Sequence, residues 1–196
     1  EVYKMKVSLK KIITSLFACI LFTVSMISNI TVSAACQPKL YLLANNMRTY
    51  TAKPGETVTI TYNVDAPDHT WCATGVHINY DKRLTTKINN RTGGFAYTKG
   101  PVASYLSMIV EPYEIDGFKG VFVCTYGSGN SNDGSGTVMS FEVDVPANAK
   151  SGDKYPIEFW FRETENAKDI FTDYLGDKSI TEYAFTNAKN CLIVIK

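Results

Sequence analysis

One segment of this sequence brings a thiol close to an imidazole, which are the groups that a cysteine hydrolase would use. The segment is Asp68-His69-Thr70-Trp71-Cys72. A nucleophilic cysteine needs an adjacent base such as histidine to form its thiolate. In a secreted chain with other cysteines, however, a disulfide is the commoner use of such a residue. We therefore interpret Cys72 as a structural cysteine.

A second set of reactive groups consists of four acidic residues near the C-terminal third of the chain, Glu163, Glu165, Asp169 and Asp173. Most glycosidases act with a pair of carboxyl groups that face each other across a cleft. Here the four acids fall in a segment whose apolar spacing predicts a helix, and they fit the solvated side of that helix. The spacing marks no catalytic pair, and the sequence predicts that the protein is not an enzyme.

The residues available for metal binding have the wrong spacing. Asn130-Ser131-Asn132-Asp133-Gly134 resembles the start of a calcium loop, but Met139 or Ser140 stands where the loop needs a glutamate. The cysteines show no CxxC spacing, and the two histidines are His69 and His77. We predict no metal site and no cofactor in this chain.

Residues 1–35 read as a secretory signal peptide, with residues 1–4 ahead of the expected start at Met5. Basic residues come first, the apolar run 12–30 follows, and small residues then precede Cys36. We expect residues 36–196 to form one secreted, extracellular bacterial domain, because about 160 residues can bury a substantial core. No sequence typical of wall anchoring is seen. The formal net charge is +1 without a Lys/Arg cluster, so nucleic acid is not expected as a partner.

Four cysteines remain after residue 35, and an even number in a secreted chain indicates two disulfides. They can pair in three ways; they are Cys36, Cys72, Cys124 and Cys191. Lipidation is an alternative for Cys36, because Ser33-Ala34-Ala35 approximates the small-residue box of a lipoprotein signal.

The mature chain is patterned for β-strands. Residues 138–145 alternate between apolar and polar side chains, and Pro146 then ends the run. Residues 72–80 alternate in the same way, with Thr74, Val76, Ile78 and Tyr80 on one side. Further strands are expected at 38–45, 57–64, 104–110, 118–126, 155–159 and 190–195, and a short amphipathic helix at 164–174. The pattern predicts an all-β sandwich with about nine strands and one helical insertion.

Four segments, taken in order, resemble the cohesin modules of cellulosomal scaffoldins. They are Lys53–Val64 (KPGETVTITYNV), Gly75–Asp81 followed by Leu84, Gly136–Phe159, and Asn190–Ile195. The similarity spans nearly the whole mature chain. It differs from the family where Cys191 replaces a usual glycine, and at the insertion after Phe161. The resemblance implies a nine-stranded jelly-roll β-sandwich with a short helical insertion between the last two strands.

The family's strand arrangement also implies disulfide pairings. In cohesins the first and last strands are parallel neighbours, which would bring Cys36 near Cys191. The third and sixth strands are antiparallel neighbours, which would bring Cys72 near Cys124. We expect these two bridges.

The resemblance implies that the protein binds a dockerin and helps to assemble an extracellular cellulosome, a complex that degrades plant cell walls. Calcium is expected on the dockerin. In this family the partner lies across strands 8, 3, 6 and 5, which implies the contact residues Ala73, Gly75, His77, Asn79, Tyr105, Ser107, Phe122, Tyr126, Ser128, Glu158, Trp160 and Arg162. Core packing is the alternative for Trp160 and Phe122, because a one-residue slip reverses the two faces of a strand.

A secreted carbohydrate-binding module is the alternative function. Such sandwiches stack sugar rings on exposed aromatic side chains. Trp71, Tyr97 and Tyr113 could form a platform of that kind. An exposed platform would favour this alternative over dockerin binding.

Overall fold

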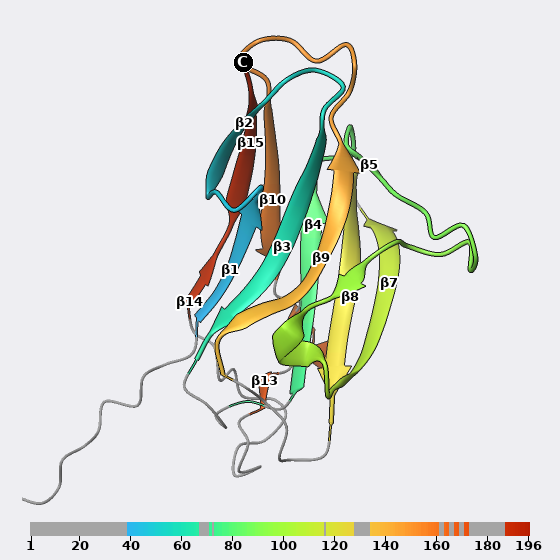
Figure 1. Cartoon of the computed structure of the whole chain (residues 1–196), viewed down its shortest axis with the longest axis vertical. Coiled ribbons are helices and arrows are strands. Elements are labelled where there is room, and N and C mark those ends of the chain that lie inside the picture. The colour runs from blue at the N-terminus through green and yellow to red at the C-terminus, as the bar shows by residue number, and fades with distance from the viewer. Residues whose placement is uncertain are drawn as a thin grey trace, which may run out of the picture. The chain divides into compact units, whose positions relative to one another are not determined.

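Two β-sheets packed face to face make up most of the described part of the chain in a computed structural model (Figure 1), and a separate two-stranded sheet joins residues 163–164 and 167–168. The structure describes residues 39–66, 71, 73–115, 117–127, 134–160, 163–164, 167–168, 171–172 and 187–196. All of these belong to one compact unit, Cys36–Lys196. An all-β sandwich was expected from the alternating sequence, and the fold class is confirmed.

The first sheet has the strand order β14-β1-β3-β9-β5, with β6 also paired to β9. Its pairs are antiparallel except for β1 with β14. A short 3-10 helix, η1 (Pro101–Ala103), follows β6. The strands of this sheet are β1 (Lys39–Ala44), β3 (Thr57–Asp65), β5 (Thr85–Thr86), β6 (Thr98–Lys99), β9 (Gly136–Asp144) and β14 (Asn187–Lys189).

The second sheet has the order β2-β15-β10-β4-β8-β7, with β13 also paired to β4. β4 and β8 are antiparallel neighbours, as the cohesin resemblance implies. The last strand, β15, has β2 as its parallel neighbour, whereas the predicted first strand, β1, lies in the other sheet and pairs with β14. The strands are β2 (Thr49–Ala52), β4 (Ala73–Tyr80), β7 (Ser107–Ile115), β8 (Phe118–Tyr126), β10 (Lys154–Trp160), β13 (Phe171–Thr172) and β15 (Cys191–Ile195).

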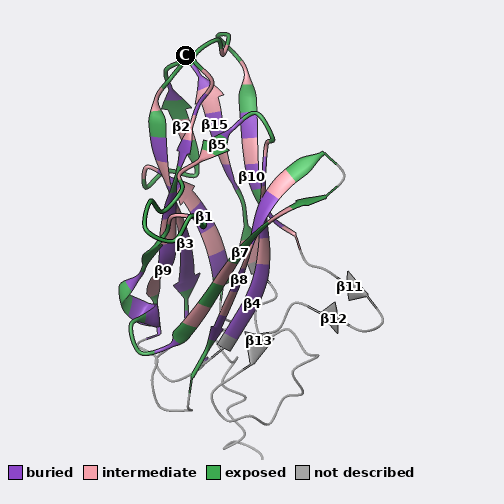
Figure 2. Ribbon diagram, turned by 90° about the vertical axis from the view of Figure 1, so that its right-hand side faces the viewer, coloured by how far each residue is buried: buried purple, intermediate pink, exposed green. Residues whose placement is uncertain are grey.

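The core lies between the two sheets and is built from alternate residues of each strand (Figure 2). On β3 the buried residues include Val58 and Ile60, while Thr57 and Thr59 point away from the core. The same period of two buries every second residue of β4, β8 and β10. Trp71 is fully buried, and its indole N–H donates to the Gly134 carbonyl at 2.9 Å. A buried indole N–H needs such a partner, so this contact fixes the entry to β4.

The amphipathic helix expected at 164–174 is wrong for the described residues of that segment. Residues 163–164 (β11) pair with 167–168 (β12), and β13 extends the second sheet beside β4. Threonine and phenylalanine favour strands, and the edge of β4 beyond Trp160 offers backbone groups that β13 can pair with. The three- and four-residue apolar spacing was therefore misleading.

The two described cysteines carry free thiols. Cys191 is buried in the core, which raises the pKa of its thiol to about 12. Cys124 is half-buried, and burial raises the pKa of its thiol as well. Their expected partners, Cys36 and Cys72, lie outside the described residues, so the two pairings stay predictions.

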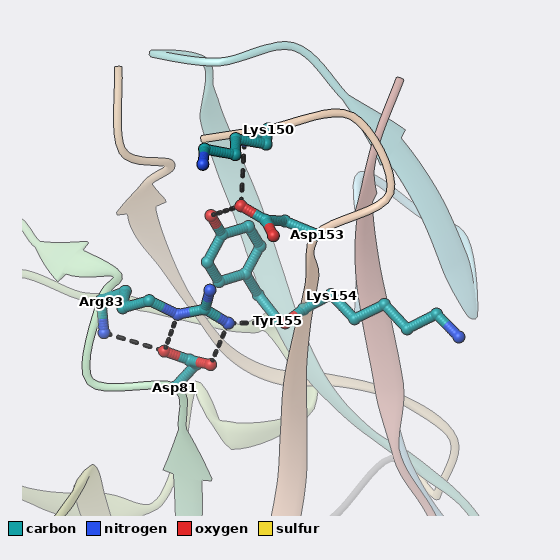
Figure 3. Close-up of polar contacts among 6 residues, drawn as sticks. All are labelled: Asp81, Arg83, Lys150, Asp153, Lys154 and Tyr155. Atoms are coloured by element: carbon teal, nitrogen blue, oxygen red, sulfur yellow. Dashed lines mark hydrogen bonds and ion pairs between the residues drawn. The ribbon is translucent and has the colours of Figure 1, made fainter. Parts of the chain in front are cut away.

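An arginine fixes the turn after β4 (Figure 3). The Arg83 guanidinium donates two hydrogen bonds to the Asp81 carboxylate, at 2.9 and 2.8 Å, and a third to the Lys154 carbonyl. Its carbon lies 4.4 Å from the centre of the Tyr155 ring. These hydrogen bonds lower the pKa of Asp81. The contacts tie the end of β4 to the start of β10, two adjacent strands of the site described next.

Within the described residues, no helix has the length and apolar character needed to cross a membrane.

Candidate functional site

The outer surface of β10, β4, β8 and β7 carries the largest set of clustered aromatic side chains that point away from the core. We call this surface the aromatic face. Residues paired directly across antiparallel strands lie on the same side of the sheet, so the register defines rows of neighbours. One row is Glu158, Asn79, Gly120 and Tyr113. The next row is Trp160, His77, Phe122 and Glu111.

Four rings from these rows form one cluster around His77. The centre of the imidazole ring lies 4.8 Å from that of Phe122, 5.2 Å from that of Tyr113 and 5.6 Å from that of Trp160. The Tyr113 and Trp160 ring centres are 6.2 Å apart. All four side chains are half-buried. The cluster is thus a continuous apolar surface that remains partly open to solvent.

A glycine makes room for the tyrosine of this cluster. A Cβ atom added at Gly120 would lie 2.4 Å from the Tyr113 ring, so the ring rests directly on the backbone of β8. The Tyr113 hydroxyl donates to the Asn79 side-chain oxygen on β4. Packing against Gly120 and the bond to Asn79 hold the ring flat across the sheet.

The charged side chains in the two central rows of the aromatic face are both acidic. Glu158 and Glu111 are exposed and lie at the two ends of the rows, on β10 and β7. The ion pairs found among described residues use other acidic side chains, Asp65, Asp81 and Asp144. The rings are therefore flanked by two carboxylates without an ion-pair partner in the described part of the chain.

Most of the predicted contact residues that the structure describes lie on this face. His77, Asn79, Phe122, Glu158 and Trp160 belong to the two central rows. The next row along the sheet, beyond that of His77, contains Gly75, which is buried, beside Cys124 and Ile109. The row after it contains Tyr126, which is exposed, beside Ser107. The pattern places Trp160 and Phe122 outward rather than in the core. Whether these residues bind a partner stays a prediction.

The structure does not place the other four predicted contact residues on this face. Tyr105 is 69% exposed but belongs to the turn before β7, because the strand starts at Ser107 rather than at residue 104. The backbone of Ala73 is in β4, and its side chain is outside the described set. Ser128 and Arg162 lie outside the described residues.

Sequence reasoning missed Tyr113 as a member of this cluster. The run expected at 104–110 ended too early, whereas β7 continues through Pro112 to Ile115. Pro112 is tolerated there because β7 is an edge strand of the sheet. The signal that could have found Tyr113 is Gly120, a small residue in the middle of a strand, which often marks a site where another group approaches closely.

The aromatic residues suggested for a sugar platform do not come together. Trp71 is fully buried, so it offers no exposed ring. Tyr97 is 40% exposed and lines a cavity of about 240 Å³ with Thr59 and Ser140 on the opposite sheet. Tyr113 belongs to the aromatic face. This platform is therefore not formed.

Metal-ligand geometry is also missing in the described part: no three His, Cys, Asp or Glu side chains there gather closely enough to hold an ion.

No family profile and no curated protein sequence matches the chain. Solved structures do. A type III cohesin module from the cell-surface anchoring scaffoldin ScaE of Ruminococcus flavefaciens is 25% identical, with a TM-score of 0.66 over 86% of this chain and 93% of that one. The chain has the cohesin fold.

Other cohesins are more distant in sequence. The sixth cohesin of Acetivibrio cellulolyticus scaffoldin B, solved in complex with a Cel5 dockerin mutant, is 12% identical, with a TM-score of 0.57 over 81% of this chain and 99% of that one. A non-cellulosomal cohesin from the archaeon Archaeoglobus fulgidus is 10% identical, with a TM-score of 0.53 over 81% and 91%. Cohesin folds are non-catalytic protein-interaction modules, so this domain is not an enzyme.

Proposed function

We propose that this domain binds a dockerin module through its aromatic face. The observation that carries the proposal is the cluster of four rings on the outer surface of β10, β4, β8 and β7, in a domain with the cohesin fold. The sixth cohesin of scaffoldin B is a structural neighbour that was solved with a dockerin bound. We further propose that the protein is secreted and acts as an adaptor in an extracellular, cellulosome-type complex.

The physical properties of the face suit a protein partner. Aromatic side chains bury a large area at a low cost in conformational entropy, and they are enriched among residues that dominate binding energy. Gly120 lets the Tyr113 ring lie close to the sheet, so the ring can be part of a shallow surface that a partner covers. Half-buried rings between exposed polar side chains give the apolar centre and polar rim that are typical of interfaces.

Calcium is assigned to the partner in this proposal. In the described part of this chain no set of ligands could hold the ion. We therefore expect calcium to order the dockerin and leave this domain unchanged.

The test is calorimetric titration of the domain with a panel of dockerins, in calcium and in chelator, beside soluble cellulose and xylan oligosaccharides. We expect saturable one-to-one binding of a dockerin that vanishes in chelator, while thermal unfolding of this domain stays the same in both buffers. If the oligosaccharides gave a heat of binding and no dockerin did, the proposal would be overturned and glycan binding would be favoured.

A further inference from the structure

Two carboxylates flank the ring cluster at opposite corners. Glu158 lies on β10 in the first row, and Glu111 lies on β7 in the second row. Both are exposed, and neither forms an ion pair within the described residues. The same two rows contain no described lysine or arginine. A partner that covers the rings thus meets an apolar centre between two negative charges.

The distance between the two corners follows from sheet geometry. Three strand-to-strand steps separate β10 from β7, which is about 14 Å, and the two rows are about 7 Å apart along the strands. The Cα atoms of Glu158 and Glu111 are then roughly 16 Å apart on the diagonal. The ring cluster surrounds that diagonal: Trp160 and Tyr113 lie at the other two corners, and His77 and Phe122 lie on the two strands that the diagonal crosses.

The length of this diagonal determines which positions of a helix lying along it would face Glu158 and Glu111. A rise of 1.5 Å per residue means that about 16 Å corresponds to about eleven residues. A residue eleven positions after another is rotated from it by close to three full turns, so the two point to the same side of the helix. Residues about four and seven positions after the first also point to that side and would lie over the rings.

On the basis of the proposed function, we propose that the dockerin helix contacting this face carries two basic residues about eleven positions apart, with apolar residues between them. The basic side chains pair with Glu158 and Glu111, and the apolar ones cover the cluster of His77, Tyr113, Phe122 and Trp160. Charge complementarity at the rim then selects among dockerins, because a partner with acidic residues at those positions would be repelled.

The experiment uses whichever dockerin of the panel binds the parent domain most tightly. Glu111→Gln and Glu158→Gln are made singly and together, because glutamine keeps the size of the side chain and removes its charge. We expect each to raise Kd about threefold and the pair about tenfold at low salt, as for partly exposed ion pairs. The double variant should also lose most of the salt dependence of Kd, because screening acts on the charges it removes.

Glu142→Gln is the matched control. Glu142 is exposed on β9 of the opposite sheet, so its loss should leave both Kd and the salt dependence unchanged. The dockerin side is tested by replacing each of its two basic residues with glutamine. Each should couple to one glutamate in a double-mutant cycle.

The outcomes separate this inference from the function on which it rests. If the parent binds a dockerin and the double variant keeps the same Kd and salt dependence, the charge pairing is overturned and dockerin binding stands. If a dockerin that binds tightly has no pair of basic residues at that spacing, the charge pairing is likewise overturned and dockerin binding stands. If the parent binds no dockerin at all, both proposals fail.

Discussion

The outer surfaces of the two sheets differ in how their side chains are satisfied. On the first sheet, most outward residues of β3 and β9 are short and polar, and several bond to one another; exposed Glu142 is an exception, with no ion pair among the described residues. Thr57 donates to Asp144 at 2.5 Å, the Asn63 amide donates to Thr61 at 2.9 Å, and Thr137 donates to the Asn63 oxygen at 2.8 Å. The Asp144 carboxylate also accepts two hydrogen bonds from Lys87. The polar groups of this surface form their hydrogen bonds within the monomer or with water.

The aromatic face has the opposite character. Its rings are only half-buried, and its two carboxylates have no ion-pair partner in the described chain. Apolar area open to water and unpaired charge are both relieved when a complementary partner binds. Two surfaces built on similarly alternating strands therefore differ in what their side chains leave exposed, and this difference is what favours the aromatic face as the proposed binding surface.

The largest effect is expected in the ring cluster of the aromatic face. Trp160→Ala removes one ring of the cluster and should weaken dockerin binding by about 2 kcal/mol, roughly thirtyfold. Calorimetric titration measures the change. Thermal unfolding should move little, because the side chain lies outside the core. Tyr97→Ala removes an exposed ring from the opposite surface and should leave Kd unchanged. If both variants weakened dockerin binding equally, the two surfaces would not differ in their contribution to binding.

A smaller effect is expected from Gly120→Ala. The added methyl group would lie 2.4 Å from the Tyr113 ring, so the ring must move off the sheet and release Asn79. We expect dockerin binding to weaken about tenfold, by about 1.4 kcal/mol. In a Tyr113→Ala background the same change should add almost nothing, because the ring that it displaces is already gone. Additive effects of the two substitutions would show that Gly120 acts by another route.

The strands of the sandwich could be predicted because burial on one face imposes a period of two. Val58 and Ile60 on β3, like Val76 and Ile78 on β4, are all fully buried, and the sequence marks each of them by alternation. The predicted outward residues of β4, β8 and β10 follow from the same parity. Hydrophobic burial therefore determined most of what the sequence could show about the fold and the candidate face.

What the sequence could not show depends on contacts between distant segments. β2 (Thr49–Ala52) has only four residues and is held by pairing with β15. β13 is a strand because the β4 edge is available to it. Tyr113 joins the ring cluster only because the β7–β8 register puts it across from Gly120. Periodicity within one segment does not encode such pairings.

The smallest effect is expected on the polar surface, at Asp144. Hydrogen bonds from Lys87 and then from Thr57 lower the pKa of this carboxyl, so its charged form stabilises the fold above the carboxyl's unfolded pKa, and this stabilisation is lost as pH falls through the folded one. Asp144→Asn should lower the free energy of unfolding by about 0.5 kcal/mol near neutral pH, as expected for a partly exposed pair. Urea unfolding should show this gap between parent and variant closing below about pH 4. Dockerin affinity should stay the same, because the hydrogen bonds of Asp144 are made within the monomer. A loss of affinity in this variant would mean that the polar surface also contacts the partner.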